Sequence, residues 1–394
     1  MERLKRGNLR VDEINKSRRR KLKYIVVIVV FLFLLLVAGI IVLTIKTKSY
    51  NAFKVRNTVE IPNIDADHVT PYKNGILRTT RDGAETIAAD GKQVWNVSYN
   101  MKNPIVDVNS NYAIIADMGG KTAYIVNGSG VSNAIETLYS IVEVKVASQG
   151  VAAILMNNGT EDYINIYSME STQPLLSIKS LATKDGFPIT MALSDDGTKL
   201  VTSYIKVEND TITSQVTFRN FGDVGKNYID QVVGNFSFMS FVPKIEFVTN
   251  NNVAIYMEDG LYLYSMEEIP VELSKEIYTQ KIVDIISTDQ YVGVVLESED
   301  GAVANPIYVY NLNGKKIMNS SVSYSYTDMT ATDDYIVFYN DLSCQVMNMK
   351  GKTVFNDNFT STVRKIIKGR SSKEFFAITD TGFDTLDMVE TKEE

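Results

Sequence analysis

Carboxylate pairs are the side chains of this sequence that could carry acid–base chemistry. They are Asp195 with Asp196, Asp333 with Asp334, and the group Glu297, Glu299 and Asp300. Two acidic groups can share the roles of general acid and general base where no histidine is available. All of these residues, however, stand in stretches typical of turns, where carboxylates are usually solvated. We therefore expect no catalytic residue among them.

Other reactive side chains are scarce. The 394 residues include one histidine, His68, and one cysteine, Cys344. A lone cysteine excludes an internal disulfide, and its β-rich surroundings indicate a small core residue. A lone histidine without neighbours at ligand spacing indicates a surface or turn residue and excludes a His-rich metal site. The sequence predicts no metal-binding and no cofactor-binding residue.

Short motifs for phosphate, calcium or nucleophile chemistry are also missing. The sequence contains no G-x-x-x-x-G-K-[ST] loop, no D-x-D-x-D-G loop and no G-x-S-x-G elbow. The segment DMGGK at 117–121 has two glycines and a lysine, but it lies in a predicted hairpin with no helix after it. Phosphate binding is not expected there.

Charge divides the chain into a basic start and an acidic remainder. Residues 1–23 contain ten Lys and Arg against three acids, which gives a net charge of +7. Because the whole chain carries −7, the remainder carries −14. An acidic body of this size repels phosphate, so nucleic acid is not an expected partner.

An apolar stretch, YIVVIVVFLFLLLVAGIIVLTI at residues 24–45, separates the two parts. As a helix it would extend about 33 Å, enough to cross a hydrocarbon core of about 30 Å, so a lipid bilayer is the expected partner of this stretch. It exceeds the apolar run of a signal peptide, and no clear A-x-A cleavage site follows. Because the basic residues precede it, the sequence predicts an uncleaved, single-pass plasma-membrane anchor. Residues 1–23 would be cytoplasmic and the C-terminal part extracytoplasmic.

A repeat of about 42 residues follows the apolar stretch. Polar residues that close an apolar strand recur at intervals of 37, 41, 52, 45, 46, 37 and 39 residues: Asp90, Asn127, Ser168, Asn220, Ser265, Asn311, Asn348 and Asp387. This spacing is typical of the four-stranded blades of β-propellers. Runs of consecutive apolar residues fit strands that are covered on both faces, as in radially stacked blades. Turns such as Asn313-Gly314 separate the strands.

The sequence therefore predicts an all-β fold, a β-propeller of eight four-stranded blades over residues 58–389. Seven blades are the alternative if one irregular repeat is a decoration. The interval of 52 residues is explained by an extended hairpin at 198–218 that turns near Asn209-Asp210. Tyrosines at four strand positions are expected to pack between blades: Tyr262, Tyr264, Tyr308 and Tyr310. Trp95 is the only tryptophan, which disfavours the quinone-cofactor propellers with their recurring tryptophan motifs.

The ends of the repeat region predict how the ring closes. The last repeat lacks a fourth strand, and the strand NTVEIPN at 57–63 belongs to no repeat. We expect this strand to complete the last blade, because such closure leaves no open sheet edge. Residues 46–57 are then a linker, and residues 390–394 an acidic C-terminal tail.

The stretch ALSDDGTKLVTSY at 192–204 resembles the S-P-D-G-x-x-L/I signature of TolB/WD40-type propeller repeats. Ser194, Asp196, Gly197 and Leu200 match it, and Asp195 stands where proline is usual. The resemblance implies a tight hairpin between the first and second strands of a blade. The whole layout resembles uncharacterised membrane proteins of Gram-positive, clostridial-type bacteria with one span and a large extracytoplasmic domain of unknown function. It implies no catalytic or binding residue.

Two functions are compatible with these features. The first, which we favour, is a non-enzymatic binding or scaffold protein at the bacterial cell envelope, whose propeller loops hold a protein, peptide or envelope glycan. The alternative is a hydrolase or lyase that acts on an envelope carbohydrate or peptide through acids in the central channel. Two or three carboxylates converging in the channel would favour the enzyme. A sensor would need a cytoplasmic partner, because residues 1–23 are too few for a signalling domain.

Overall fold

The computed structural model describes residues 29–37, 50–208, 211–298 and 304–391. Residues 29–37 are helical. Among the described residues, no helix is long and apolar enough to cross a membrane. The predicted basic tail and most of the predicted span at 24–45 lie outside the described residues.

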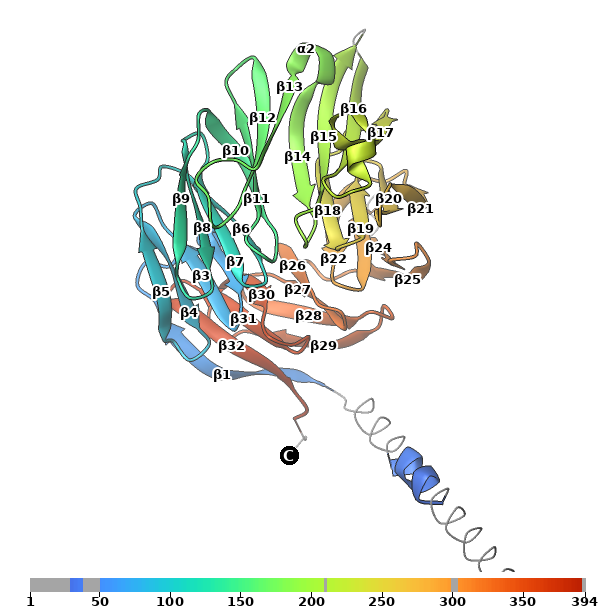
Figure 1. The fold of residues 1–394 in the computed structure, drawn as a ribbon. Helices are drawn as coiled ribbons and strands as arrows, with labels where there is room; N and C mark the ends of the chain where they lie inside the picture. The colour runs from blue at the N-terminus through green and yellow to red at the C-terminus, as the bar shows by residue number, and fades with distance from the viewer. Residues whose placement is uncertain (1–28, 38–49, 209–210, 299–303, 392–394) are drawn as a thin grey trace, which may run out of the picture. The chain divides into compact units, whose positions relative to one another are not determined.

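The chain divides into two units, one of residues 1–50 with 390–394 and one of residues 51–389. The second unit is a ring of eight antiparallel sheets of four strands each (Figure 1). Seven sheets consist of four consecutive strands, which we number blades 1 to 7 in chain order, and blade 8 combines β30, β31 and β32 with β1. The structure confirms the prediction of eight four-stranded blades and excludes the seven-bladed alternative.

The bounds of the strands follow blade by blade. Blades 1 and 2 comprise β2 (Val69–Tyr72), β3 (Gly75–Thr79), β4 (Gly83–Ala88), β5 (Gln93–Ser98), β6 (Pro104–Asn109), β7 (Tyr112–Asp117), β8 (Thr122–Asn127) and β9 (Ser132–Glu136). Blades 3 and 4 comprise β10 (Ser140–Val146), β11 (Ala152–Asn157), β12 (Glu161–Tyr167), β13 (Leu176–Leu181), β14 (Phe187–Leu193), β15 (Lys199–Glu208), β16 (Thr211–Asn220) and β17 (Val232–Phe238). Blades 5 and 6 comprise β18 (Lys244–Thr249), β19 (Asn252–Tyr256), β20 (Gly260–Ser265), β21 (Val271–Ile277), β22 (Ile282–Ser287), β23 (Tyr291–Leu296), β24 (Asn305–Asn311) and β25 (Lys316–Val322). Blades 7 and 8 comprise β26 (Asp328–Ala331), β27 (Tyr335–Tyr339), β28 (Ser343–Asn348), β29 (Thr353–Asn358), β30 (Val363–Lys368), β31 (Glu374–Thr379), β32 (Gly382–Val389) and β1 (Ala52–Glu60).

Short helical turns occur in the connections of the ring. They are η1 (Ala66–His68), α2 (Ala182–Asp185), η2 (Gly225–Asn227) and η3 (Ile229–Gln231). The expected long hairpin is present, because β15 and β16 have ten residues each and pair along their whole length. The α2 turn, which the repeat spacing does not predict, also contributes to the interval of 52 residues.

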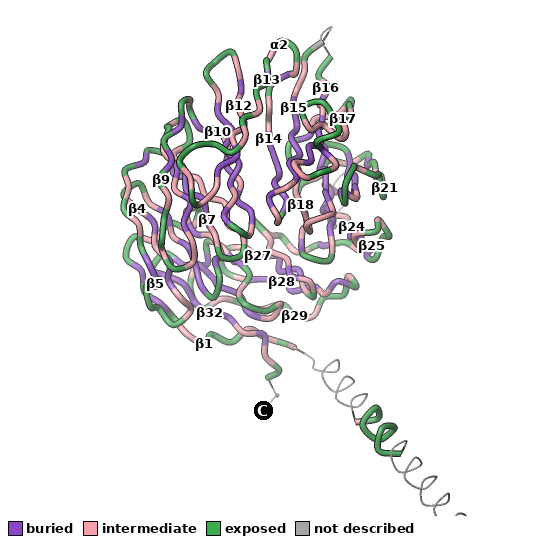
Figure 2. The backbone as a smooth tube through the Cα atoms, in the orientation of Figure 1, coloured by how far each residue is buried: buried purple, intermediate pink, exposed green. Residues whose placement is uncertain are grey.

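The hydrophobic core lies between the blades. Figure 2 shows buried residues along the strands and exposed residues at the turns. Each cluster of buried side chains joins two successive blades: Ile114 of blade 2 packs with Ile154 of blade 3, and Val201 of blade 4 with Val253 of blade 5. Because neighbouring blades cover both faces of a middle strand, such strands are apolar at consecutive positions, as in YAIIAD of β7.

A recurrent Asn-x-x-Gly turn explains why several third strands end in a polar residue. Asn127, Asn311 and Asn348 each accept, through the side-chain oxygen, the backbone N–H groups of the residues two and four positions later. The glycine three positions later donates its N–H to the carbonyl oxygen of the asparagine. These glycines have φ values of 85°, 78° and 78°: Gly130, Gly314 and Gly351. Glycine adopts this conformation without steric cost, which fixes the residue type.

The turn that resembles the TolB/WD40 signature connects β14 to β15, the first and second strands of blade 4, as the resemblance implied. Asp196 accepts hydrogen bonds from Ser194 Oγ at 2.7 Å, from the Thr198 N–H at 2.9 Å, and from Asn250 Nδ2 of blade 5 at 2.7 Å. Partial burial opposes ionisation of Asp196, but these hydrogen bonds outweigh it and lower its pKa to about 2. The turn therefore also joins two blades.

Closure of the ring depends on the N-terminal strand. β1 pairs with β32 from Ala52 opposite Val389 to Glu60 opposite Gly382, so an N-terminal strand completes the last blade as predicted. It begins at Ala52, within the stretch expected to be a linker at 46–57. The earlier start has a packing cause, because the ring of Phe53 makes edge contacts with Phe355 and Phe375.

A buried carboxylate ties the two ends of the propeller together. Glu374, the first residue of β31, is 4% exposed. It accepts a hydrogen bond from Arg56 of β1 and two from the guanidinium of Arg370, each at 3.1 Å. Burial opposes ionisation of Glu374, but the Arg370 and Arg56 hydrogen bonds outweigh it and lower its pKa to about 2.

Candidate functional site

The turns at the two ends of the strands form two faces of the ring. Connections from first to second and from third to fourth strands lie on one face, where Asn51 precedes β1 and Val389 ends β32. We call this the entry face. Connections from second to third strands and those between blades lie on the other, which we call the opposite face.

The carboxylates that the sequence singled out do not converge. Asp195 and Asp196 occupy a turn of blade 4, and Asp333 and Asp334 a turn of blade 7, both on the entry face. Asp334 accepts a hydrogen bond from Ser372 Oγ at 2.5 Å. Glu297 follows β23 on the opposite face, whereas Glu299 and Asp300 lie outside the described residues. The described pairs are turn residues of separate blades, as expected.

The lone histidine and the lone cysteine are also where the sequence placed them. His68 ends η1, and its Nε2 lies 3.9 Å from a carboxylate oxygen of Asp65. Cys344 is fully buried in β28, and burial raises its pKa to about 12, so it stays a thiol. In the part of the chain that the structure describes, no group of three His, Cys, Asp or Glu residues could hold a metal ion.

The four tyrosines pack as expected. Tyr262, Tyr264 and Tyr310 are buried in clusters between blades, and Tyr308 stacks on Tyr278 with ring centroids 5.8 Å apart.

A set of acids that the sequence analysis missed lines the central channel. In five blades the first strand carries an acid within its first four residues: Asp107, Glu143, Glu246, Asp284 and Asp328. Two of them, Asp107 and Glu246, border a hollow of about 330 Å³ together with Lys145 and Lys244. The channel thus collects carboxylates, which is the arrangement that would favour an enzyme.

Hydrogen bonds to the next blade occupy most of these acids. Asp107 accepts the N–H of Val146 at 2.8 Å, and Glu143 accepts that of Met191 at 2.9 Å. Glu246 accepts from Ser287 Oγ at 2.8 Å, and Asp284 from the Tyr326 hydroxyl at 2.7 Å. The carboxylates therefore join the first strands of successive blades around the channel.

Charge in the channel is largely paired. Lys145 lies 3.2 Å from Glu143, and Lys244 lies 3.1 Å from Glu246. Burial raises the pKa of Asp107 to about 6, although Lys145 and the Val146 N–H favour its ionised form. Burial disfavours the charged form of Lys145, but Asp107 and Glu143 outweigh it and raise its pKa. The arrangement is that of a partly buried ion-pair network, in which the acids hold neighbouring strands together.

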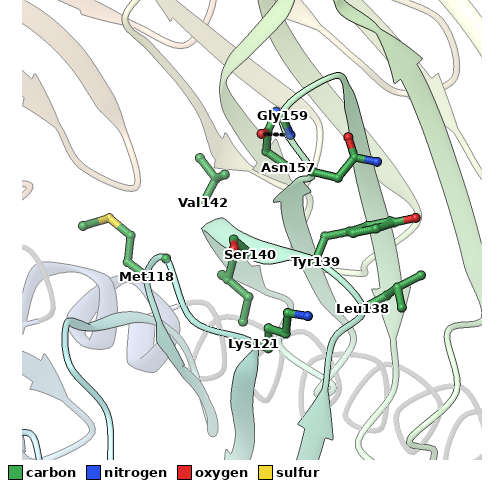
Figure 3. Close-up of a pocket in the computed structure, with 11 residues that line it drawn as sticks. Met118, Lys121, Leu138, Tyr139, Ser140, Val142, Asn157 and Gly159 are labelled. Carbon is green, nitrogen blue, oxygen red and sulfur yellow. Dashed lines mark hydrogen bonds between the residues drawn. The ribbon is translucent and has the colours of Figure 1, made fainter.

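A groove on the opposite face is larger than the hollow in the channel. Its volume is about 630 Å³, and it lies between blades 2 and 3 (Figure 3). Three segments line it: Met118, Gly119 and Lys121 after β7, Leu138 to Val142 at the start of β10, and Asn157, Asn158 and Gly159 after β11. Leu138, Met118 and Val142 are 69%, 46% and 40% exposed, although apolar. Figure 3 shows Met118 on one side of the groove and Tyr139 and Leu138 on the other.

Backbone hydrogen bonds hold the walls of the groove. The Gly119 N–H donates to the Ile141 carbonyl and the Ile141 N–H to the Gly120 carbonyl, both at 2.8 Å, which attaches the β7–β8 turn to β10. Thr137 Oγ1 donates to the carbonyls of Lys121 and Tyr139. The Tyr139 ring stacks on Tyr163 at 5.0 Å. DMGGK at 117–121 is thus the β7–β8 turn, the predicted hairpin, and a wall of the groove.

The lining of this groove suits binding. It includes no carboxylate, imidazole or thiol among its residues, and Lys121 is its one charged group. Apolar walls with a few amides and hydroxyls bury an apolar side chain and orient a polar backbone. We name it the blade 2–3 groove.

Comparison with solved structures finds several that this chain resembles. BamB from Moraxella catarrhalis matches with a TM-score of 0.53 and 12% identity, over 86% of this chain and 100% of that chain. The Pan2 WD40 domain of Neurospora crassa matches with a TM-score of 0.41 and 8% identity, over 74% and 90% of the two chains. At 12% identity the likeness to BamB shows the fold alone.

Comparisons by sequence give a family without an activity. A search among curated proteins finds no match. A family model described as "Family of unknown function (DUF5711)" matches residues 46–388, which is most of the chain and nearly all of the propeller. The chain therefore belongs to the DUF5711 family of unknown function.

Proposed function

We propose that this chain is a non-enzymatic binding protein of the bacterial cell envelope that holds a protein or peptide partner in the blade 2–3 groove. The observation that carries the proposal is the lining of this groove. Leu138, Met118 and Val142 are apolar yet 69%, 46% and 40% exposed, and hydrogen bonds hold the backbone around them. Exposed apolar side chains that gather in a formed groove are typical of binding surfaces.

The alternative is a hydrolase or lyase whose active site lies in the channel. The carboxylates of the channel support this alternative. Asp107, with a pKa of about 6, would be the general acid. Against it, Asp107, Glu143 and Glu246 already accept hydrogen bonds from neighbouring blades or pair with lysines. Such groups maintain strand register, so we prefer binding in the groove.

The groove is tested with the fragment of residues 46–394, whose sheets and core clusters all lie within residues 51–389. Short random peptides displayed on phage are selected on this fragment and then measured by fluorescence anisotropy. L138D is expected to weaken binding about tenfold or more, because burial of a leucine stabilises by about 1.5–3 kcal/mol. The matched control is L175D, since Leu175 is 62% exposed on the entry face of blade 3. Equal binding to L138D and the unchanged fragment would reject the groove as the binding site.

A membrane anchor at residues 24–45 is part of the proposal and is supported by the uncharged apolar run and the preceding basic residues. Asn51 lies at the entry face of the propeller, and the blade 2–3 groove lies on the opposite face. In intact bacterial cells, added protease is expected to remove a C-terminal epitope tag and to spare an N-terminal one. The reverse pattern would contradict the orientation.

A further inference from the structure

A second hollow adjoins the blade 2–3 groove. Its volume is about 560 Å³, and Met118 lines both hollows. Residues from three other segments of the opposite face complete it: Asn63, Asp65 and His68 before β2, Arg78 to Arg81 at the end of β3, and Lys102 to Ile105 at the start of β6. The two hollows therefore follow one another along the opposite face across blades 1 to 3.

The lining of the second hollow has a net positive charge, although residues 24–394 as a whole are acidic. Its lining contains Arg78, Arg81 and Lys102 against one carboxylate, Asp65. Lys121 adds a fourth cation in the adjoining groove. Residues 24–394 as a whole carry −14, because the chain carries −7 and residues 1–23 carry +7. Cations gathered against this background indicate a ligand with negative charge.

Two of these cations are available to a ligand. Arg78 is engaged, since it pairs with Glu85 at 3.0 Å and donates to the carbonyls of Pro62 and Asn63. Arg81 and Lys102 are exposed. Neither side chain has a hydrogen bond or ion pair within the described ranges.

The carboxylate of Asp117 holds the backbone around Lys102 in place through hydrogen bonds. Asp117 Oδ1 accepts the N–H groups of Lys102 and Asn103 at 2.9 and 2.8 Å. Asp82, beside Arg81 in the β3–β4 turn, is exposed and does not line either hollow. The hollow that contains Arg81 and Lys102, which we call the cationic half, is therefore held in place next to the blade 2–3 groove, the apolar half.

We propose that the two hollows form one composite site for an acidic peptide segment. An apolar side chain of the segment lies between Leu138 and Met118, and its carboxylates face Arg81 and Lys102. This inference rests on the proposed function and adds the chemistry of the occupant. A peptide fits better than an anionic envelope polymer, because sugar-phosphate chains have no apolar group for the blade 2–3 groove.

The test combines charge reversal with the display selection. Selected peptides are expected to carry Asp or Glu beside an apolar residue, and replacement of these acids by Asn or Gln should weaken binding about tenfold. R81E/K102E is expected to cause a similar loss. K315E/K350E is the control, because both lysines are exposed in entry-face turns, and it should change binding less than about twofold. The loss should shrink as the salt rises from about 0.1 M to about 1 M.

Three outcomes would overturn the inference, and they are distinguishable. Peptides that depend on Leu138 but bind equally well in Asn/Gln form would reject the acidic ligand and leave the proposed function standing. Peptides insensitive to L138D would reject the proposed function as well. Binding of a polyphosphate probe that is lost in R81E/K102E and kept in L138D would assign the cationic half to an anionic polymer. Thermal unfolding of each variant within a few degrees of the unchanged fragment shows that it is folded.

Discussion

A fragment of residues 62–394 is expected to lose cooperative unfolding, whereas the fragment of residues 46–394 keeps it. The shorter fragment lacks β1 and therefore exposes the edge of β32 along its whole length. It also lacks Val59 and Ile61, which are buried with residues of blades 1 and 8. Two buried side chains of this size contribute about 3–6 kcal/mol, a large share of a typical total of about 5–15 kcal/mol.

The two fragments are compared by thermal unfolding followed by circular dichroism, and by gel filtration. The 46–394 fragment should show one sharp transition and a monodisperse peak. The 62–394 fragment should show a broad, shallow signal and aggregate through its open edge. If it melted sharply within a few degrees of the longer fragment, the N-terminal strand would be dispensable and the closure described here would be wrong.

Loss of the Glu374 carboxylate is expected to lower the free energy of unfolding by about 2–3 kcal/mol. E374A removes hydrogen bonds from Arg56 and Arg370, which are charge-assisted and stronger than neutral ones. Both arginines are nearly half exposed, so water can solvate them, and the loss stays below the 3–5 kcal/mol typical of a fully buried broken pair. Urea unfolding of the 46–394 fragment measures it. The control E60A, at an exposed glutamate of the same sheet, should change stability by less than about 0.5 kcal/mol.

The same carboxylate predicts part of the acid sensitivity. The pKa of Glu374 is lowered from 4.5 to about 2 by folding, so its contribution is fully present above about pH 4.5 and is lost as the pH falls towards 2. In E374Q this loss has already occurred, and its stability should depend less steeply on pH between 4.5 and 2. Parallel curves for the two proteins would show that Glu374 is not held ionised by the fold.

The blades could be predicted because each repeat carries its own local signals. The polar residues Asn127 and Asn348, which the repeat spacing marks as strand ends, are the last residues of β8 and β28. The start of β1 could not be read in the same way. Its first half includes Lys54 and Arg56, which are exposed at the outer edge of blade 8. Pairing with β32 and the contacts of Phe53 with Phe355 and Phe375 make this half a strand.

The blade 2–3 groove depends on contacts between distant segments, which single-sequence patterns do not reveal. Leu138 looks like an ordinary residue of a connection, and its exposure is evident only once the Gly119–Ile141 hydrogen bond brings three segments together. The acids of the channel, in contrast, had a readable signal. The stretches IVDV, IVEV and IVDI place Asp107, Glu143 and Asp284 at the same position of three first strands. Aligning first strands as well as third strands would have found them.

Pairing of the first strand with the last imposes an order on biosynthesis. β1 leaves the ribosome about 320 residues before β32 is made, so at about 5–20 residues per second it waits roughly 15–65 s for its partner. During that time blades 1 to 7 can form from consecutive strands, while β1 and the flank of the nascent ring stay unpaired. Completion of the ring is therefore a late, non-local step with high contact order. Factors that shield unpaired strands until synthesis is complete should therefore affect the yield of this protein more than that of propellers whose blades are all built from consecutive strands.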